Sequence, residues 1–202
     1  DHNSHVSHLY GLYPGDQISI KETPELAEGV RKSLELRGNQ SFGGWPAAWR
    51  IALHAHLRDK EMAHFRVVNL IADSANPNMM NLRPPLPMQM DGNFGGTAGM
   101  TEMLLQSKGC YDGKEVIYEI ELLPALPDQW DWGSIRGVRA RGGFELDLFW
   151  TEGKLDKAVL RSLKGMKCRI QYSDQFEILE TTAGETYSLF LNDGFIRREQ
   201  DG

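Results

Sequence analysis

The chain has 202 residues, of which 41% are hydrophobic and 25% are charged, and its formal net charge is −6. This length is enough for one large or two small domains, each with a real hydrophobic core. The acidic balance argues against a nucleic-acid partner, and no apolar stretch approaches the roughly 20 residues that cross a bilayer. The first residues do not follow a signal-peptide pattern, and we expect no membrane partner.

Histidines are concentrated at the start of the chain, at His2, His5 and His8. On a helix, the three-residue spacing of His5 and His8 would place both side chains on one face, where they could bind a metal or hydrogen-bond a polar ligand in a cleft. Because no HExxH pattern accompanies them, we favour the polar ligand and predict no metal site.

The first half of the chain then predicts three helices separated by short links. Thr23 as N-cap, Pro24 at the first helical position and Gly38 as the stop delimit the first helix. Apolar residues at helical spacing predict the other two helices over residues 46–58 and 60–73. The short links predict antiparallel neighbours.

Residues 74–92 have no periodic pattern and are predicted to form a long loop ending at Asp91, with a helix following over residues 97–106. Three prolines stiffen the approach to Asp91, and three glycines permit a close turn after it. Asp91 has two interpretations. It is either a capping or turn aspartate, or a functional carboxylate on a rigid loop. The prolines are Pro84, Pro85 and Pro87, and the glycines are Gly92, Gly95 and Gly96.

In the second half, short alternating segments are separated by turn signals such as Gly142-Gly143 and Glu152-Gly153. The predicted class is therefore α+β, with residues 116–202 forming a small antiparallel β-sandwich. The two cysteines, Cys110 and Cys168, lack the spacing of a zinc or redox site. We expect two free thiols, and the alternative is a disulfide between them.

Five motifs occur in an order that resembles glycoside hydrolase family 95, which contains inverting α-L-fucosidases and some α-L-galactosidases. The resemblance implies that residues 1–115 are the C-terminal helices of an (α/α)6 toroid and that residues 116–202 form a C-terminal β domain. It also implies a missing N-terminal part as partner, and a secreted or periplasmic location. The motifs are SHLYGLYPG at 7–15, GW at 44–45 with AWR at 48–50, QMDGNFG at 89–95, LLPALP at 122–127 and ARGGF at 140–144.

The resemblance implies how the complete enzyme would cleave terminal, α-1,2-linked fucosides in oligosaccharides or glycans. A glutamic acid would protonate the glycosidic oxygen, and a water would attack from the opposite face with inversion. Asparagine amides polarised by an aspartate would activate that water, and Asp91 matches the aspartate. The glutamic acid and the asparagines precede residue 1 in the family, so we expect this chain alone to be inactive.

The same resemblance gives the expected substrate contacts and implies no cofactor. His5 matches a histidine that contacts the fucosyl unit, and Trp45 and Trp49 are either packing residues or platforms for a sugar ring. Ser4 stands where the family commonly has an arginine, which leaves the sugar identity open. The alternatives are an α-L-galactosidase or a non-catalytic carbohydrate-binding or scaffold fragment. The substrate-binding set is His5, His8, Trp45, Trp49 and Asn93.

Overall fold

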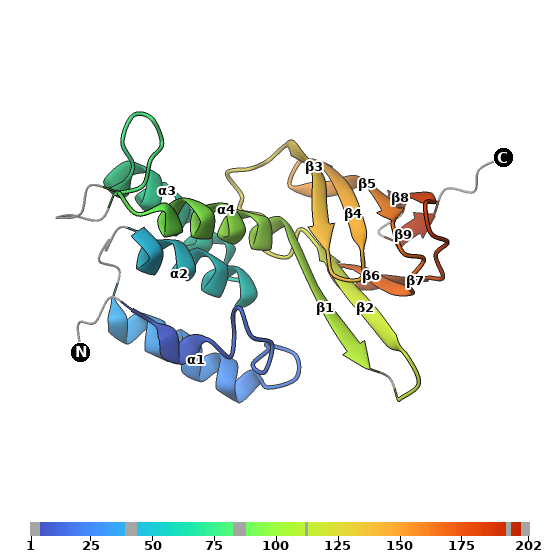
Figure 1. The fold of residues 1–202 in the computed structure, drawn as a ribbon, viewed down its shortest axis with the longest axis horizontal. Coiled ribbons are helices and arrows are strands. Elements are labelled where there is room, and N and C mark those ends of the chain that lie inside the picture. The colour runs from blue at the N-terminus through green and yellow to red at the C-terminus, as the bar shows by residue number, and fades with distance from the viewer. Residues whose placement is uncertain (1–4, 39–43, 83–87, 112, 193–194, 199–202) are drawn as a thin grey trace. The chain divides into compact units, whose positions relative to one another are not determined.

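The chain divides into two compact units, Asp1–Met103 and Leu104–Gly202 (Figure 1). The structure is a computed structural model, and it describes residues 5–38, 44–82, 88–111, 113–192 and 195–198. Helices make up the first unit and strands make up the second, which confirms the predicted α+β class. Within the described residues, no helix is both long and apolar enough to cross a bilayer.

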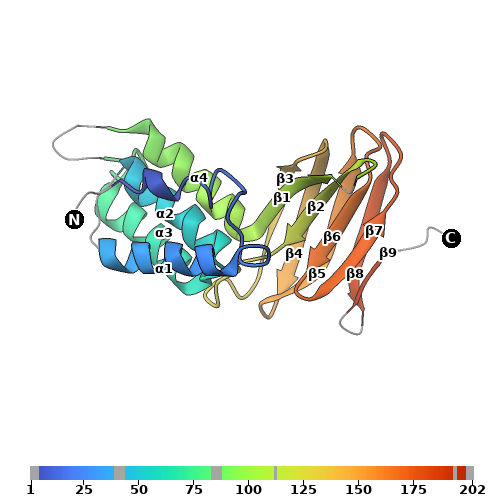
Figure 2. The same ribbon diagram turned by 90° about the horizontal axis from the view of Figure 1, so that it is seen from below.

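The first unit begins with a short 3-10 turn and contains four α-helices in its described part (Figures 1 and 2). Three of the helices lie where the sequence predicts them. Pro24 opens the first of these helices and Gly38, with φ of 72°, closes it. Asp59 caps the third helix by accepting from the backbone N–H of Met62 at 3.3 Å. The elements are η1 Ser7–Leu9, α1 Pro24–Arg37, α2 Gly44–His56, α3 Lys60–Ser74 and α4 Met90–Leu104.

The α2 helix is the centre of the first unit, because its residues from Pro46 to Ala55 are buried on every side of the helix. One of its faces contributes Trp49 and Leu53 to a hydrophobic cluster with η1 and α1. Alanines form much of the remaining surface of α2, which lets neighbouring helices approach closely. The other members of the cluster are Val6, Leu9, Leu12, Ala27, Val30, Leu34 and Leu57.

The α4 helix begins earlier than predicted, where the sequence suggested the end of a loop and a glycine turn around Asp91. It begins at Met90, seven residues before the predicted start at Thr97, so Asp91 lies in the first turn of a helix. Gly95 and Gly99 are helical residues that allow contact with α2. A Cβ built on Gly95 would lie 2.9 Å from the Cβ of Ala48, and one on Gly99 would lie 2.7 Å from the Cβ of Ile51.

The order of these contacts gives the direction of the helices. On α2, a Cβ at Gly92 would meet Gly44, one at Gly95 would meet Ala48 and one at Gly99 would meet Ile51, so the residue numbers of the contacts increase along both helices. The α4 helix therefore runs parallel to α2, and the two N-terminal ends lie side by side. The three prolines predicted to stiffen the approach to Asp91 lie outside the described residues.

The second unit has two sheets that share one hydrophobic core. The four-stranded sheet has the order β1-β2-β6-β7, and the five-stranded sheet has the order β3-β4-β5-β8-β9. Phe144 and Leu146 of one sheet and Ile120 and Ile170 of the other belong to the same buried cluster. The strands are β1 Leu105–Tyr111, β2 Val116–Leu122, β3 Gly133–Ala140, β4 Phe144–Thr151, β5 Lys154–Ser162, β6 Cys168–Tyr172, β7 Gln175–Leu179, β8 Thr186–Asn192 and β9 Phe195–Arg198.

One feature of this unit differs from the prediction, and one of its strands was not predicted. The sheets are not purely antiparallel, because β2 and β6 pair in parallel, with Ile120 opposite Ile170. A further strand, β1, begins at Leu105 inside this unit and pairs along its whole length with β2. The polar sequence of β1, which contains Gly109, lacks the alternation that would reveal a strand. Within the described residues, neither Cys110 nor Cys168 forms a disulfide bond.

Replacing Gly99 with alanine is expected to lower the free energy of unfolding. The new methyl group would overlap with Ile51, and such overpacking costs about 1–3 kcal/mol, against a gain in helix propensity of at most about 1 kcal/mol. Gly29→Ala in α1 is the matched control, because nothing lies within 4 Å of a Cβ there. That control should stabilise the chain slightly. Urea unfolding followed by circular dichroism measures both, and equal effects would contradict the close contact of α4 with α2.

Candidate functional site

Asp91 lies in the first turn of α4, beside the N-terminal end of α2, and its side chain is exposed. The positive end of the helix dipole favours a carboxylate in this position. Because Asp91 lies inside the helix, it is not the N-cap residue that the sequence allowed. No described residue donates a hydrogen bond to this carboxylate.

The residues on either side of Asp91 bind the neighbouring backbone. Gln89 Oε1 accepts from the backbone N–H of Trp45 at 3.0 Å, which connects the start of α4 to the start of α2. The Asn93 amide accepts from Asn81 N at 2.9 Å and donates to the carbonyl oxygen of Met79 at 2.8 Å. Asn93 was predicted to contact substrate, but both the oxygen and the nitrogen of its side-chain amide already bind backbone groups.

The two tryptophans form a stacked pair, with ring centroids 5.1 Å apart and an interplanar angle of 26°. Trp49 is only 6% exposed, and its indole N–H donates to the carbonyl oxygen of Tyr13 at 2.8 Å. Trp49 is therefore a packing residue in this chain. Trp45 is half-buried and contacts the same hydrophobic cluster, so it remains the tryptophan that a ligand could reach.

The first histidines do not share a helix face. His5 precedes the 3-10 turn and is half-buried, whereas His8 lies within that turn and is exposed. The ring of His8 makes a hydrogen bond through Nε2 to Ser33 Oγ at 2.7 Å, which connects the turn to α1. Partial burial, together with the charge of Arg37, lowers the pKa of His8. Within the described part of the chain, no three His, Cys, Asp or Glu side chains are grouped as metal ligands.

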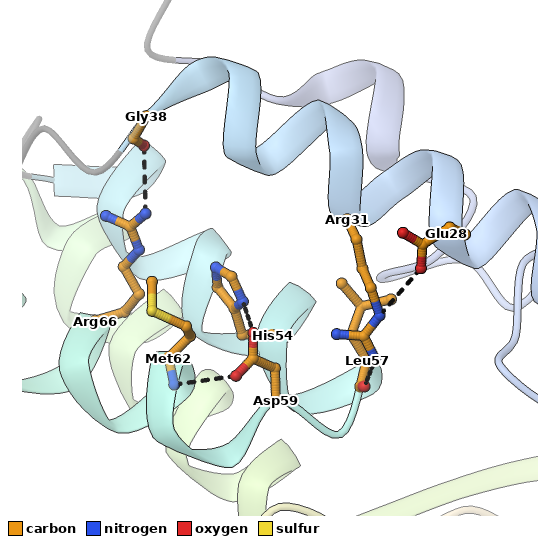
Figure 3. A network of polar contacts seen from close by, with 8 residues as sticks. All are labelled: Glu28, Arg31, Gly38, His54, Leu57, Asp59, Met62 and Arg66. Atoms are coloured by element: carbon orange, nitrogen blue, oxygen red, sulfur yellow. Dashed lines mark hydrogen bonds and ion pairs between the residues drawn. The ribbon is translucent and has the colours of Figure 1, made fainter.

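A second polar cluster, which the sequence did not single out, lies within the helical unit (Figure 3). His54 Nδ1 donates to Asp59 Oδ2 at 3.2 Å, and Arg66 donates to the carbonyl oxygen of Gly38 at 3.3 Å. Burial lowers the pKa of His54, although Asp59 acts in the opposite direction. The hydrogen bond from His54 lowers the pKa of Asp59. Burial also lowers the pKa of Arg66, to about 10.

These contacts connect the end of α1 with α2 and α3. Arg50 also donates to the carbonyl oxygen of Gly38, at 2.8 Å, so two guanidinium groups meet the C-terminal end of α1. His56, two residues after His54, turns to another side and donates to Glu102 of α4 at 2.9 Å. The spacing of His54 and His56 predicts that they lie on different faces of the helix. Their partners, Asp59 and Glu102, could be identified only from the fold.

Comparison with known proteins finds two family matches along the chain. Residues 1–104 match the glycosyl hydrolase family 95 catalytic domain, and residues 116–194 match the glycoside hydrolase family 95 C-terminal domain. The chain is 37% identical over 200 residues to alpha-L-fucosidase 2 of Arabidopsis thaliana, covering 93% of this chain and 22% of that protein. It is 32% identical over 168 residues to probable alpha-fucosidase A of Aspergillus oryzae, covering 76% of this chain and 23% of that protein. The chain thus spans less than a quarter of the length of these curated relatives.

The buried His54 is expected to make the chain less stable in acid. Because its pKa in the folded state lies below the ordinary value of about 6.5, the unfolded state binds more protons once the pH falls below that value. The free energy of unfolding should therefore decrease between about pH 7.5 and about pH 5.5. His54→Gln should reduce this decrease, whereas His64→Gln, at a half-buried histidine of α3, serves as control. Urea unfolding at both pH values tests this, and an unchanged pH dependence in His54→Gln would count against it.

Proposed function

Because the chain belongs to glycoside hydrolase family 95, we propose that it is the C-terminal part of a glycosidase that hydrolyses terminal α-L-fucosides with inversion. The names of the two fucosidases that it resembles support this substrate class. The observation that carries the proposal is the exposed carboxylate of Asp91, which lies inside the matched catalytic domain beside the paired ends of α2 and α4.

In this proposal the first unit is part of an (α/α)6 toroid and the second is a β-sandwich. The parallel direction of α2 and α4, with α3 between them in the chain, suits a toroid in which alternate helices share one direction. The single core between the four-stranded and five-stranded sheets suits a sandwich. The catalytic domain then covers residues 1–115 and the C-terminal domain residues 116–202, with β1 and its turn as the connection.

The proposed role of Asp91 is to polarise an amide that activates the attacking water. Its carboxylate would accept an N–H from an asparagine amide supplied by an earlier part of the enzyme, which increases the negative charge on the amide oxygen. That oxygen would accept a proton from the water as the water attacks the anomeric carbon. A glutamic acid on the opposite face would protonate the leaving oxygen, with roughly 6.5–9.5 Å between the two groups.

The remaining roles concern the sugar. His5 and His8 would hydrogen-bond hydroxyl groups of the fucosyl unit, since an imidazole can both donate and accept. The half-buried Trp45 would contact the apolar face of the ring, and Trp49 would support it by stacking. The fucosylated glycan and the N-terminal part of the enzyme are the partners of this proposal.

Asp91→Asn in the protein with a complete catalytic domain is expected to lower kcat by roughly 10²–10⁴-fold, with a much smaller change in KM. The reason is that the carboxylate acts mainly while the water loses its proton. Asp73→Asn, at an exposed aspartate of α3, is the matched control and should change neither constant. Steady-state kinetics on an α-L-fucoside measure the effect, and a loss confined to KM would argue for a binding role.

The 202-residue chain by itself is expected to show no turnover of an α-L-fucoside or an α-L-galactoside, because the proposed mechanism takes its general acid from a part of the enzyme outside these residues. The complete protein should hydrolyse the fucoside in preference to the galactoside. Release of free sugar, followed by chromatography, tests both statements. Binding of fucose by a complete protein that hydrolyses neither substrate would favour the carbohydrate-binding alternative.

A further inference from the structure

We propose that Asn93 and Gln89 are positioning residues that hold the first turn of α4 so that Asp91 faces its reaction partner. This inference rests on the proposed function, and it replaces the substrate contact that the sequence suggested for Asn93. Neither residue would touch the reacting atoms. Their effect would pass through the backbone of the turn to the carboxylate of Asp91.

The Asn93 side chain acts as a bridge between α4 and the turn of residues 76–82. Its Oδ1 accepts from the backbone N–H of Asn81 at 2.9 Å, and its Nδ2 donates to the carbonyl oxygen of Met79 at 2.8 Å. Engaging the acceptor and the donor at once fixes the orientation of the amide. A side chain held in this way has little freedom to turn toward a sugar.

Gln89 makes the corresponding contacts two residues before Asp91. Its side-chain oxygen accepts from the backbone N–H of Trp45 at 3.0 Å, and its own backbone N–H donates to the carbonyl oxygen of Asn81 at 2.9 Å. Asn81 thus binds Gln89 through its C=O and Asn93 through its N–H, and it is only 2% exposed. The two polar residues that flank Asp91 are anchored to the same buried residue.

The spacing explains why Asp91 remains outside these contacts. Asp91 and Asn93 are two positions apart in α4, and residues at that spacing do not face each other on a helix. Gly92 strengthens the arrangement, because its missing side chain lets α4 contact Asn81 and Gly44 directly. Gln89 and Asn93 are half-buried by their contacts, whereas Asp91 is exposed.

Anchoring of this kind matters because catalytic groups must be held within about 0.5 Å of their productive position. A displacement of about 1 Å can reduce the rate about a hundredfold. Removing the Asn93 amide would remove two of the hydrogen bonds between α4 and the turn of residues 76–82, and the backbone that carries Asp91 would be held less firmly without any change to the carboxylate itself.

A double-mutant cycle in the protein with a complete catalytic domain tests the catalytic part of this inference. Asn93→Ala should lower kcat about tenfold or more, with KM within about twofold. In the Asp91→Asn background, the same substitution should lower kcat less than about twofold, because Asn93 acts through Asp91. Independent, multiplying losses, or a loss seen mainly in KM, would overturn the positioning role in favour of a direct sugar contact.

Asn78→Ala is the matched control, because Asn78 Oδ1 accepts from Met80 N at 3.1 Å within the same turn and does not contact α4 by that bond. We expect its kcat and KM to remain those of the unmodified protein. A loss equal to that of Asn93→Ala would mean that any change in the turn suffices, which would overturn the specific role of Asn93.

Hydrogen exchange on the 202-residue chain separates this inference from the proposed function. Asn93→Ala should speed exchange of the Asn81 amide and of the Gly92 amide, which donates to the carbonyl oxygen of Gln89 at 3.0 Å. This readout needs no activity. If Asn93→Ala speeds this exchange but the complete protein is inactive on fucosides, the proposed reaction is wrong and the anchoring role of Asn93 is supported. Unchanged exchange at both amides would overturn the anchor whatever the activity.

Discussion

The close contact of α4 with α2 is the constraint on which the helical unit depends. Glycines at positions 92, 95 and 99 bring the two backbones together, and alanine or glycine faces them from α2 at two of these three contacts. Dispersion contacts of this density leave little room for larger side chains. The order of these contacts makes the two helices parallel and places their first turns side by side, and Asp91 lies exposed in the first turn of α4.

Local signals in the sequence were sufficient for much of the fold. Pro24 and Gly38 delimit α1 because their backbone preferences act within one turn, and Glu152-Gly153 marks a real turn because both residues adopt positive φ. Features that depend on contact with a distant helix or strand could not be predicted from the sequence. Glycines that line a helix contact look like a turn until the opposite helix is known. Likewise, the parallel pairing of β2 with β6 joins residues that are 50 positions apart in the chain, such as Ile120 and Ile170.

In the candidate site too, the sequence indicated which residues matter but not how they are arranged. The ordered motifs were enough to indicate the family and to select Asp91, but not to place it in a helix. The amide of Asn93 suits sugar recognition as well as backbone anchoring, and only its contacts with Met79 and Asn81 distinguish the two. The pairs His54–Asp59 and His56–Glu102 went unpredicted, because each requires knowing which side of α2 meets which neighbour.

The parallel pairing of β2 with β6 has a consequence for how the second unit can be divided. Between these two strands the chain forms β3, β4 and β5, all in the other sheet, and after β7 it returns to that sheet as β8. Each sheet is thus interleaved with the other along the polypeptide. A cut anywhere between Ala140 and Cys168 separates strands of both layers, so neither layer can be excised, exchanged or expressed as an autonomous module.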